Sequence, residues 1–341
     1  MRQVDGSHGE GGGQLLRTAI ALSTLTGEAV SISKIRANRP KPGLSPSHCT
    51  SVEGVASISG AKVEGNHPGS TELTFVPGEV ATGEHPLDVG TAGSISLVLQ
   101  ALMLSAVRCT GESVFVVKGG TNVKWSPPID HYSLVLFPML RRMGLRVKME
   151  VVSRGFYPQG GGEVRVTFGR EGALRPLVLE ERGELQEIGG VCFAQNLHQR
   201  IPHEIASSVR KRFLQERVRI SQDLTEGRST GTGICLAAVY EHTVLGAEAL
   251  GERGYPAEAV GKDAAQRLRA EMDGQGTLDV HTSDQLLPYM ALAEGQSVFT
   301  VREISGHLRT QMDLLSEFLG TRFEVEGGTT VWVLPSRTLS A

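Results

Sequence analysis

Apolar and polar positions alternate along this chain in an order that predicts one supersecondary unit three times. Residues 12–35, "GGQLLRTAIALSTLTGEAVSISKI", combine apolar positions at helical spacing with a Thr-Gly stop and an alternating strand. Residues 91–119, "TAGSISLVLQALMLSAVRCTGESVFVVKG", repeat that order with the same Thr-Gly-Glu between helix and strand. Residues 282–304, "TSDQLLPYMALAEGQSVFTVREI", give a third copy with Glu-Gly-Gln in that slot. A recurring order of elements indicates an internal repeat.

The segments that follow each copy agree as well. "RANRPKPG", "GGTNVKWSPP" and "SGH" each lead into a second helical pattern, and each unit closes with an alternating strand, "STELTFVP", "GEVRVTF" or "TTVWVL". We therefore expect an α/β (α+β) protein in which three units, each of two helices and a four-stranded sheet, pack around a shared helical interior. The alternative is chance similarity between ordinary α/β units.

The spacing breaks between the second and third units. Residues 176–277 match neither neighbour and carry their own strand, helix, strands and helix pattern, so we expect a smaller inserted α/β domain there. The large domain would then comprise residues 1–175, with the first two units, and residues 278–341, with the third. Within the insert, "VRKRFLQERVR" predicts a basic helix that either faces RNA or, as we slightly favour, forms a solvated surface.

Composition narrows the classes of protein. The 341 residues carry 34 Lys+Arg against 37 Asp+Glu, which excludes a basic coat for non-specific duplex binding, so any nucleic-acid contact must come from a local cluster. The four cysteines lack metal-site spacing and are expected to be buried free thiols. The amino terminus "MRQVDGSHGE" has no signal-peptide pattern and no apolar run reaches membrane length, which predicts a soluble cytoplasmic protein with no membrane association.

The segment "GEGGGQLLRT", residues 9–18, places a carboxylate where an anion site is expected. Its glycines open directly into a helix, whose first N–H groups favour an anion, yet the Lys-Ser/Thr ending of a P-loop is absent and Glu10 lies in the middle. Either this loop binds no phosphate, or a cation lies between Glu10 and the phosphate.

Three loops become equivalent when the units are superposed, since each follows the first strand of its unit. They hold cations, an aromatic residue and a histidine, which favours one composite site over ordinary solvated loops. The residues are Arg36, Arg39 and Lys41 in the first unit, Lys118, Lys124 and Trp125 in the second, and His307 in the third.

Several of the expected helices carry polar residues that need an explanation. Arg17 lies on an otherwise apolar helix, where its guanidinium requires a partner: either a phosphate bound bidentately or an internal Asp or Glu. His307 lies near a helix start, where the dipole favours the neutral, nucleophilic imidazole, although a lone histidine is more often structural. Gln14, Gln100 and Gln285 recur on equivalent helices and suit a shared polar pocket for base, ribose or phosphate.

Seven blocks in order, "GEGGGQLLR", "RANRPKPGL", "GTAGSISLVLQ", "GGTNVKWSPP", "GFYPQGGGEV", "SDQLLPYMALA" and "SGHLRT", resemble the RNA 3′-terminal phosphate cyclases over nearly the whole chain outside the insert. The resemblance implies three α/β units like the C-terminal domain of a translation initiation factor, plus the insert. It implies an ATP-dependent conversion of an RNA 3′-phosphate end into a 2′,3′-cyclic phosphodiester through a covalent histidine–AMP intermediate, with release of AMP and pyrophosphate.

The resemblance also implies residue roles. The nucleophile falls on His307 and the metal-associated glutamate on Glu10, which would hold Mg²⁺ or Mn²⁺ against the phosphates of ATP. The same resemblance adds Arg17, Arg36 and Arg39 to the catalytic set. It places nucleotide contacts on Gln14, Gln100, His281, Thr282, Ser283, Asp284 and Gln285. The implied partner is an RNA with a 3′-phosphate end, and no protein partner is implied.

The sequence departs from the family pattern at one place. It reads "HTS" before Asp-Gln where many family members have a tyrosine-containing "YLA", so His281 would replace any aromatic residue that stacks on adenine there. Two alternatives stay open: a non-catalytic relative that acts in RNA or ribosome processing, against which His307, Glu10 and Arg17 argue, and a small-molecule phosphotransferase without a covalent step.

Overall fold

The computed structural model describes residues 1–336, and two of its units share one topology. The sheet of the first unit has the order β1-β2-β4-β3 and that of the second β5-β6-β8-β7. The first unit comprises β1 (Arg2–Asp5), α1 (Gly13–Thr26), β2 (Val30–Ser33), α2 (Pro46–Ser59), β3 (Lys62–Glu64) and β4 (Leu73–Val76). The second comprises β5 (Glu84–Asp88), α3 (Ile95–Ala106), β6 (Ser113–Gly119), α4 (Ile129–His131), the π-helical turn η1 (Tyr132–Leu136), α5 (Phe137–Arg142), β7 (Leu145–Ser153) and β8 (Gly162–Arg170).

The third unit differs from the expected four strands. It contains α8 (Val280–Ala291), β13 (Ser297–Thr300), α9 (Gly306–Leu319), β14 (Arg322–Glu326) and β15 (Thr330–Leu334), in a three-stranded sheet of order β13-β15-β14. The place of its first strand is taken by residues 177–179, because Val178 forms a parallel bridge to Val298. Residues 337–341 of the predicted third unit lie outside the described residues.

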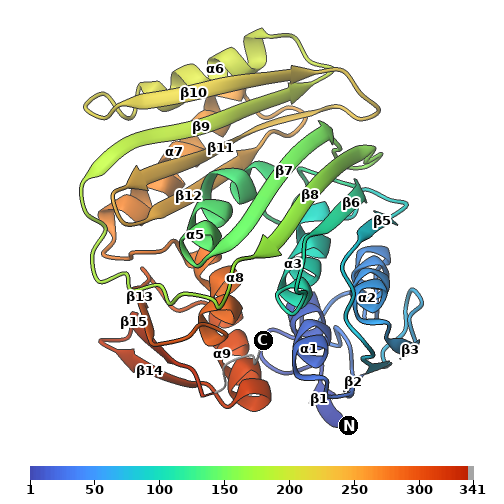
Figure 1. The fold of residues 1–341 in the computed structure, drawn as a ribbon. Coiled ribbons are helices and arrows are strands. Elements are labelled where there is room, and N and C mark those ends of the chain that lie inside the picture. Colours follow the sequence, from blue (N-terminus) through green and yellow to red (C-terminus); the bar gives the residue numbers. More distant parts are fainter. Residues whose placement is uncertain (337–341) are drawn as a thin grey trace.

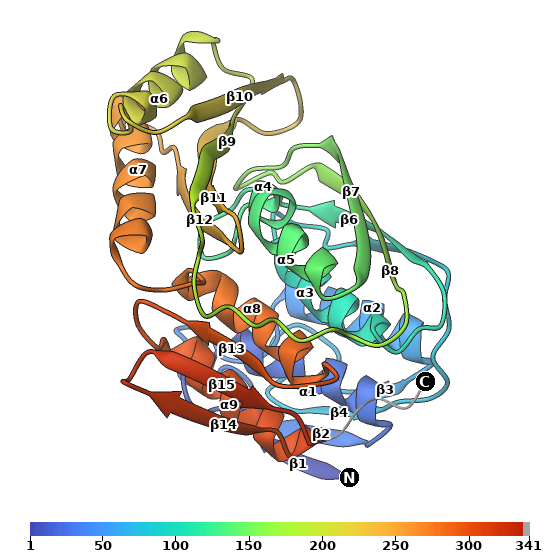
Figure 2. The same cartoon turned by 60° about the vertical axis from the view of Figure 1, so that its left-hand side comes forward.

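The mixed α/β class is confirmed, and the helices of the three units meet in a shared interior (Figures 1 and 2). Helix α1 packs against α2, α3 and α9, while α8 packs against α9 and α3. Helix α1 is buried along nearly its whole length and ends at Gly27, whose φ of 72° is the left-handed conformation that glycine adopts without strain. The amino termini of α3 and α9 are capped by Ser94 and Ser305, whose hydroxyls accept a backbone N–H.

The insert has its own sheet and its own core. It contains β9 (Leu185–Gln195), α6 (Arg200–Arg210), β10 (Val218–Thr225), β11 (Gly231–Tyr240), β12 (Val244–Leu250) and α7 (Ala257–Asp273), with the sheet order β10-β9-β11-β12. Most of its buried side chains form a cluster separate from the core of the three units, whereas Ala237 and Val244 belong to that larger core. The prediction of one basic helix over "VRKRFLQERVR" is wrong: α6 ends at Arg210, and β10 begins at Val218 because that segment pairs in parallel with β9.

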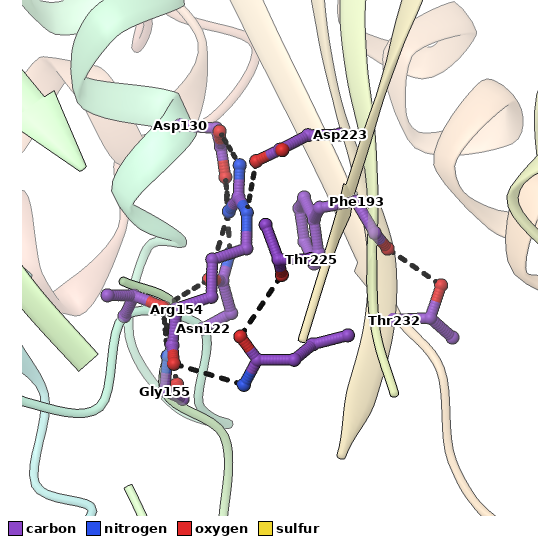
Figure 3. A network of polar contacts seen from close by, with 10 residues as sticks. Asn122, Asp130, Arg154, Gly155, Phe193, Asp223, Thr225 and Thr232 are labelled. Carbon is purple, nitrogen blue, oxygen red and sulfur yellow. Dashed lines mark hydrogen bonds and ion pairs between the residues drawn. The ribbon is translucent and has the colours of Figure 1, made fainter. Parts of the chain in front are cut away.

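One buried arginine connects the insert to the second unit (Figure 3). Arg154 donates two hydrogen bonds of 2.8 Å to the carboxylate of Asp130, which precedes η1, and one of 2.6 Å to Asp223 on β10. Its guanidinium lies 4.7 Å from the ring centre of Phe193 on β9. Because an unpaired buried charge is costly, this doubly paired cation fixes the junction between the two domains.

The cysteines lie in the interior of the fold. All four cysteines are free and buried, as predicted. Among residues 1–336, no helix combines the length and apolar character needed to cross a membrane.

Candidate functional site

The glycine-rich loop lies against the amino terminus of α9. Gly9 has a φ of +58°, and a Cβ there would collide with the side chain of Thr310. A Cβ on Gly306 would come within 2.5 Å of a carboxylate oxygen of Glu10. Both glycines are therefore required by close approach, and the approach brings the two ends of the chain together.

Glu10 and Gln14 converge on His307. The Nε2 atom of His307 lies 3.1 Å from Oε2 of Glu10, and its Nδ1 atom lies 2.9 Å from Oε1 of Gln14. An amide oxygen only accepts hydrogen bonds, so Nδ1 carries the proton in the neutral ring. The lone pair of the neutral imidazole is then on Nε2, the atom that faces Glu10, and a cation held by Glu10 would relieve the repulsion between that lone pair and the carboxylate.

The surroundings of His307 favour that neutral form. Burial lowers the pKa of His307, and the positive charges of Arg17 and Arg39 lower it further, while Glu10 acts in the opposite direction. The sequence suggested the helix terminus as the cause, and His307 is indeed the second residue of α9. Burial is the larger cause in the structure.

The two arginines of the first loop have different roles. The guanidinium of Arg39 lies 3.7 Å from Glu10 and close above Gly12, where a Cβ would come within 2.9 Å of it. Arg36 instead donates a hydrogen bond of 2.7 Å to the carbonyl oxygen of Gly43 within its own loop, and its backbone φ is +55°. Arg39 thus reaches the centre of the site, whereas Arg36 also braces the loop that carries it.

Arg17 meets Gln100 and Gln285 at a small cavity between α1, α3 and α8. Its Nε donates a hydrogen bond of 3.2 Å to Oε1 of Gln100, and all three side chains line the cavity. Burial lowers the pKa of Arg17 to about 10, so the group is charged at neutral pH. Within residues 1–336 no carboxylate forms a salt bridge with it, which leaves the guanidinium free to pair with an anion.

The start of α8 divides into one exposed and several buried residues. His281 is exposed, whereas Thr282 and Ser283 are fully buried and bonded internally, to Asp279 and to the carbonyl of Val280. Burial raises the pKa of Asp284 to about 8, and the negative charge of Asp279 adds to the rise. Of these predicted nucleotide contacts, the structure therefore brings Asp284 and Gln285 toward Arg17 and directs Thr282 elsewhere.

The sequence reasoning did not single out His48 or Gln311. His48, on α2, lies against Gly13, and its pKa is lowered to about 3 by burial, then by Arg17 and Arg36. Gln311, on α9, lines the same cavity as Arg17, and its Nε2 is buried without a hydrogen-bond partner. The glutamine recurrence at Gln14, Gln100 and Gln285 was the available signal for Gln311.

Glu10 provides the donor type that Mg²⁺ or Mn²⁺ prefers. Its carboxylate is part-exposed, at 39% for the side chain, and therefore has room for water or phosphate oxygens beside an ion. The close approach of Gly306 holds the carboxylate at the helix start. The residues present thus fit a divalent ion bound by one carboxylate and completed by phosphate.

Comparison with known proteins identifies the family of this chain. A family model described as RNA 3′-terminal phosphate cyclase matches residues 8–325. A protein of that name from Archaeoglobus fulgidus is 42% identical over 334 residues, which cover 97% of this chain and 99% of the relative. Proteins of the same name from Methanopyrus kandleri and Nitrosospira multiformis are each 43% identical and cover 95% of this chain and 95% and 93% of their own lengths. The chain belongs to the RNA 3′-terminal phosphate cyclase family.

Proposed function

We propose that this protein converts the 3′-phosphate end of an RNA into a 2′,3′-cyclic phosphodiester, using ATP and a covalent histidine–AMP intermediate. The observation that carries the proposal is the convergence of Glu10 and Gln14 on the two ring nitrogens of His307. A neutral imidazole fixed by a hydrogen bond at Nδ1 presents a nucleophilic lone pair at Nε2.

The proposed reaction proceeds in three steps. The Nε2 lone pair of His307 attacks the α-phosphorus of ATP, and the bond to pyrophosphate breaks. An oxygen of the RNA 3′-phosphate attacks the same phosphorus, and the nitrogen–phosphorus bond breaks to return the imidazole. The neighbouring 2′-hydroxyl attacks the activated 3′-phosphorus, loses its proton to solvent and releases AMP. The need for a 2′-hydroxyl limits the last step to RNA.

The charged side chains around the ring supply phosphate binding. Arg17 and Arg39 lower the pKa of His307 and would hold phosphate oxygens in the same place, so nucleophile activation and anion binding use the same charges. Arg36 would support this by holding its loop. A divalent ion on Glu10 would neutralise phosphate charge and orient the triphosphate.

The nucleotide would extend from His307 toward α8. Gln100 and Gln285 line the same cavity as Arg17. Gln14 contacts His307, Asp284 lies close enough to Arg17 for their charges to interact, and His281 is exposed at the start of α8. An imidazole can stack on adenine less extensively than tyrosine does, so we expect weaker discrimination among nucleobases than an aromatic residue would give.

Incubation with ATP labelled at the α-phosphate and a divalent metal tests the covalent step. We expect label on the protein that acid removes and base does not, as for a histidine phosphoramidate, and none on His307→Ala. Label on His307→Ala, or none on the wild type, would contradict the assignment. Without a covalent step, ATP-dependent phosphorylation of small molecules would indicate a phosphotransferase instead.

Product analysis on a short RNA with a 3′-phosphate tests the overall reaction. We expect a 2′,3′-cyclic end only with ATP present, and no cyclic end from an otherwise identical RNA with a 2′-deoxy terminal nucleotide. A protein that folds and takes up label, yet cyclises no RNA end, would separate adenylylation from the proposed substrate.

A further inference from the structure

A second group of ligating side chains lies at the junction of the insert and the second unit, outside the site described above. His131 ends α4, Cys235 lies on β11 and Glu248 on β12. The imidazole nitrogen, the thiol sulfur and a carboxylate oxygen all lie within 4.8 Å of one another. Three separate elements therefore bring a nitrogen, a sulfur and an oxygen ligand to one point.

The hydrogen bonds around His131 fix which nitrogen faces this group. The hydroxyl of Thr282 donates its single proton to Asp279 at 2.7 Å, so it can only accept from His131 Nε2, which lies 3.0 Å away. In the neutral ring Nδ1 then carries the lone pair. That atom faces Glu248 across 3.5 Å, and it is buried without a hydrogen-bond partner.

Burial makes an unpartnered nitrogen at this position costly. His131 is 1% exposed and Cys235 0%, and the nearest oxygen of Glu248 is 3.5 Å from Nδ1, longer than a good hydrogen bond. A lone pair that faces a carboxylate requires a cation between them. That cation is either a proton, in an imidazolium–carboxylate pair, or a metal ion.

At the same junction, the charged side chains around Arg154 are paired with one another. Asp130, adjacent to His131 in sequence, has both carboxylate oxygens bonded to Arg154, which also reaches Asp223 (Figure 3). In contrast, the group around His131 has carboxylate, thiol and imidazole but no cationic side chain among them. The negative charge of Asp279 acts on His131, while the positive charge of Arg267 and the imidazole of His281 act on Glu248.

We propose that His131 Nδ1, Cys235 Sγ and a Glu248 carboxylate oxygen bind one Zn²⁺ ion. Nitrogen, thiolate and carboxylate are the ligands that zinc takes in tetrahedral sites, and three protein ligands leave one position for water. The thiol gives up its proton to solvent when the metal–sulfur bond forms. Thr282 holds the ligating ring by its other nitrogen, as an outer hydrogen-bond acceptor does in known zinc sites.

Such an ion would connect the insert to the start of α8. Cys235 and Glu248 belong to the insert sheet, whereas His131 and Thr282 belong to the large domain. The site thus would tie the insert to the helix that carries His281 and Asp284. This role is structural and does not depend on the proposed reaction.

Metal analysis and cobalt substitution of the full-length protein test the proposal. After equilibration with Zn²⁺ in excess Mg²⁺, we expect one zinc per chain in the wild type, and Co²⁺ in its place should give a thiolate-to-cobalt charge-transfer absorption. Both signals should be lost in Cys235→Ala. They should persist in Cys192→Ala, a buried cysteine of the same sheet, and in Glu10→Ala, which removes the other candidate metal ligand.

A second variant keeps the test decisive if Cys235→Ala does not fold. Glu248→Gln retains the shape of the side chain, and we expect it to bind Zn²⁺ at least tenfold more weakly while its circular dichroism spectrum stays that of the wild type. Wild-type protein that binds no zinc would overturn the proposal and assign the position to a proton. Unchanged affinity in Glu248→Gln, or an unchanged thiolate band in folded Cys235→Ala, would also overturn it.

Discussion

Oε1 of Gln14 lies 2.9 Å from Nδ1 of His307, while Glu10 lies 3.1 Å from Nε2 of the same ring. The glycine-rich loop and the first turn of α1 thus contact the two nitrogens of a histidine at the start of α9. The amide selects the tautomer, and the carboxylate lies where the lone pair points. Mutation of Gln14 and mutation of Glu10 should therefore have different effects on the ring.

Gln14→Leu should slow adenylylation without a large change in the affinity for ATP. Loss of the acceptor at Nδ1 allows the proton to move to Nε2, which removes the nucleophilic lone pair from part of the population. A hydrogen bond of about 1 to 2 kcal/mol corresponds to roughly a 10-fold slower labelling rate. Single-turnover labelling across ATP concentrations measures rate and affinity separately. Gln266→Leu, on the exposed face of α7, is the control and should behave as wild type.

The pKa of His307 should shift in opposite directions in two variants. Burial already lowers this pKa, so the wild-type ring should become reactive toward diethyl pyrocarbonate at a pH below the ordinary histidine value. Glu10→Gln removes the charge that favours the protonated ring and should move the midpoint to still lower pH. Arg39→Gln removes a positive charge and should move it to higher pH. Shifts of the same sign in both variants would contradict this account of the site.

Arg17→Met should stabilise the ligand-free protein while it destroys activity. The guanidinium is buried, and among the described residues it has an amide but no carboxylate partner, so its desolvation is only partly offset. We expect a gain of about 1 kcal/mol in the free energy of unfolding and a loss of about 100-fold in labelling rate. Denaturant unfolding and labelling of the same sample measure both. A large loss of stability would make Arg17 a structural residue.

Asp284→Asn should change how stability depends on pH. With the folded pKa raised to about 8 by burial, the folded protein keeps a proton that the unfolded chain releases above its ordinary pKa near 4. Stability therefore falls as pH rises from about 4 to about 8, and is constant above that. Between pH 5 and pH 8 this contribution changes by about 4 kcal/mol, and Asp284→Asn should lack it.

Unfolding at both pH values in the presence of a metal chelator measures the effect of Asp284. Asp273→Asn, at the exposed end of α7, should keep the wild-type dependence. Identical pH profiles for wild type and Asp284→Asn would show that Asp284 is ionised in the folded protein.

Arg154→Met should be far more destabilising than the loss of a surface pair. Its removal leaves Asp130 buried without a counter-charge, for an expected cost of about 3 to 5 kcal/mol. The matched control is Arg165→Met, which removes the exposed pair with Glu84 and should cost less than about 1 kcal/mol. Equal costs in thermal or denaturant unfolding would show that the junction does not depend on Arg154.

Local pattern predicted much of this fold. The three copies of helix and strand and the buried cysteines follow from periodicity and composition, because burial of one face imposes a repeat on any amphipathic element. The helix predicted over residues 209–219 was wrong, because α6 ends at Arg210 and the residues from Val218 onward pair in parallel with β9, which a local pattern does not report. The pattern also missed the strand-like pairing of residues 177–179 with β13, which depends on a partner far along the chain.

The sequence by itself determined which features this protein has: the repeated units, the glycines around Glu10, Arg17 in an apolar helix, and His307 near the start of another helix. Only the tertiary structure decided which of these side chains meet. It joined Glu10 to His307, turned Thr282 away toward His131, and brought Cys235 to a histidine and a glutamate at no recognisable spacing. The physical reason is that periodicity reports the faces of single elements, whereas the distance between two side chains depends on how those elements pack.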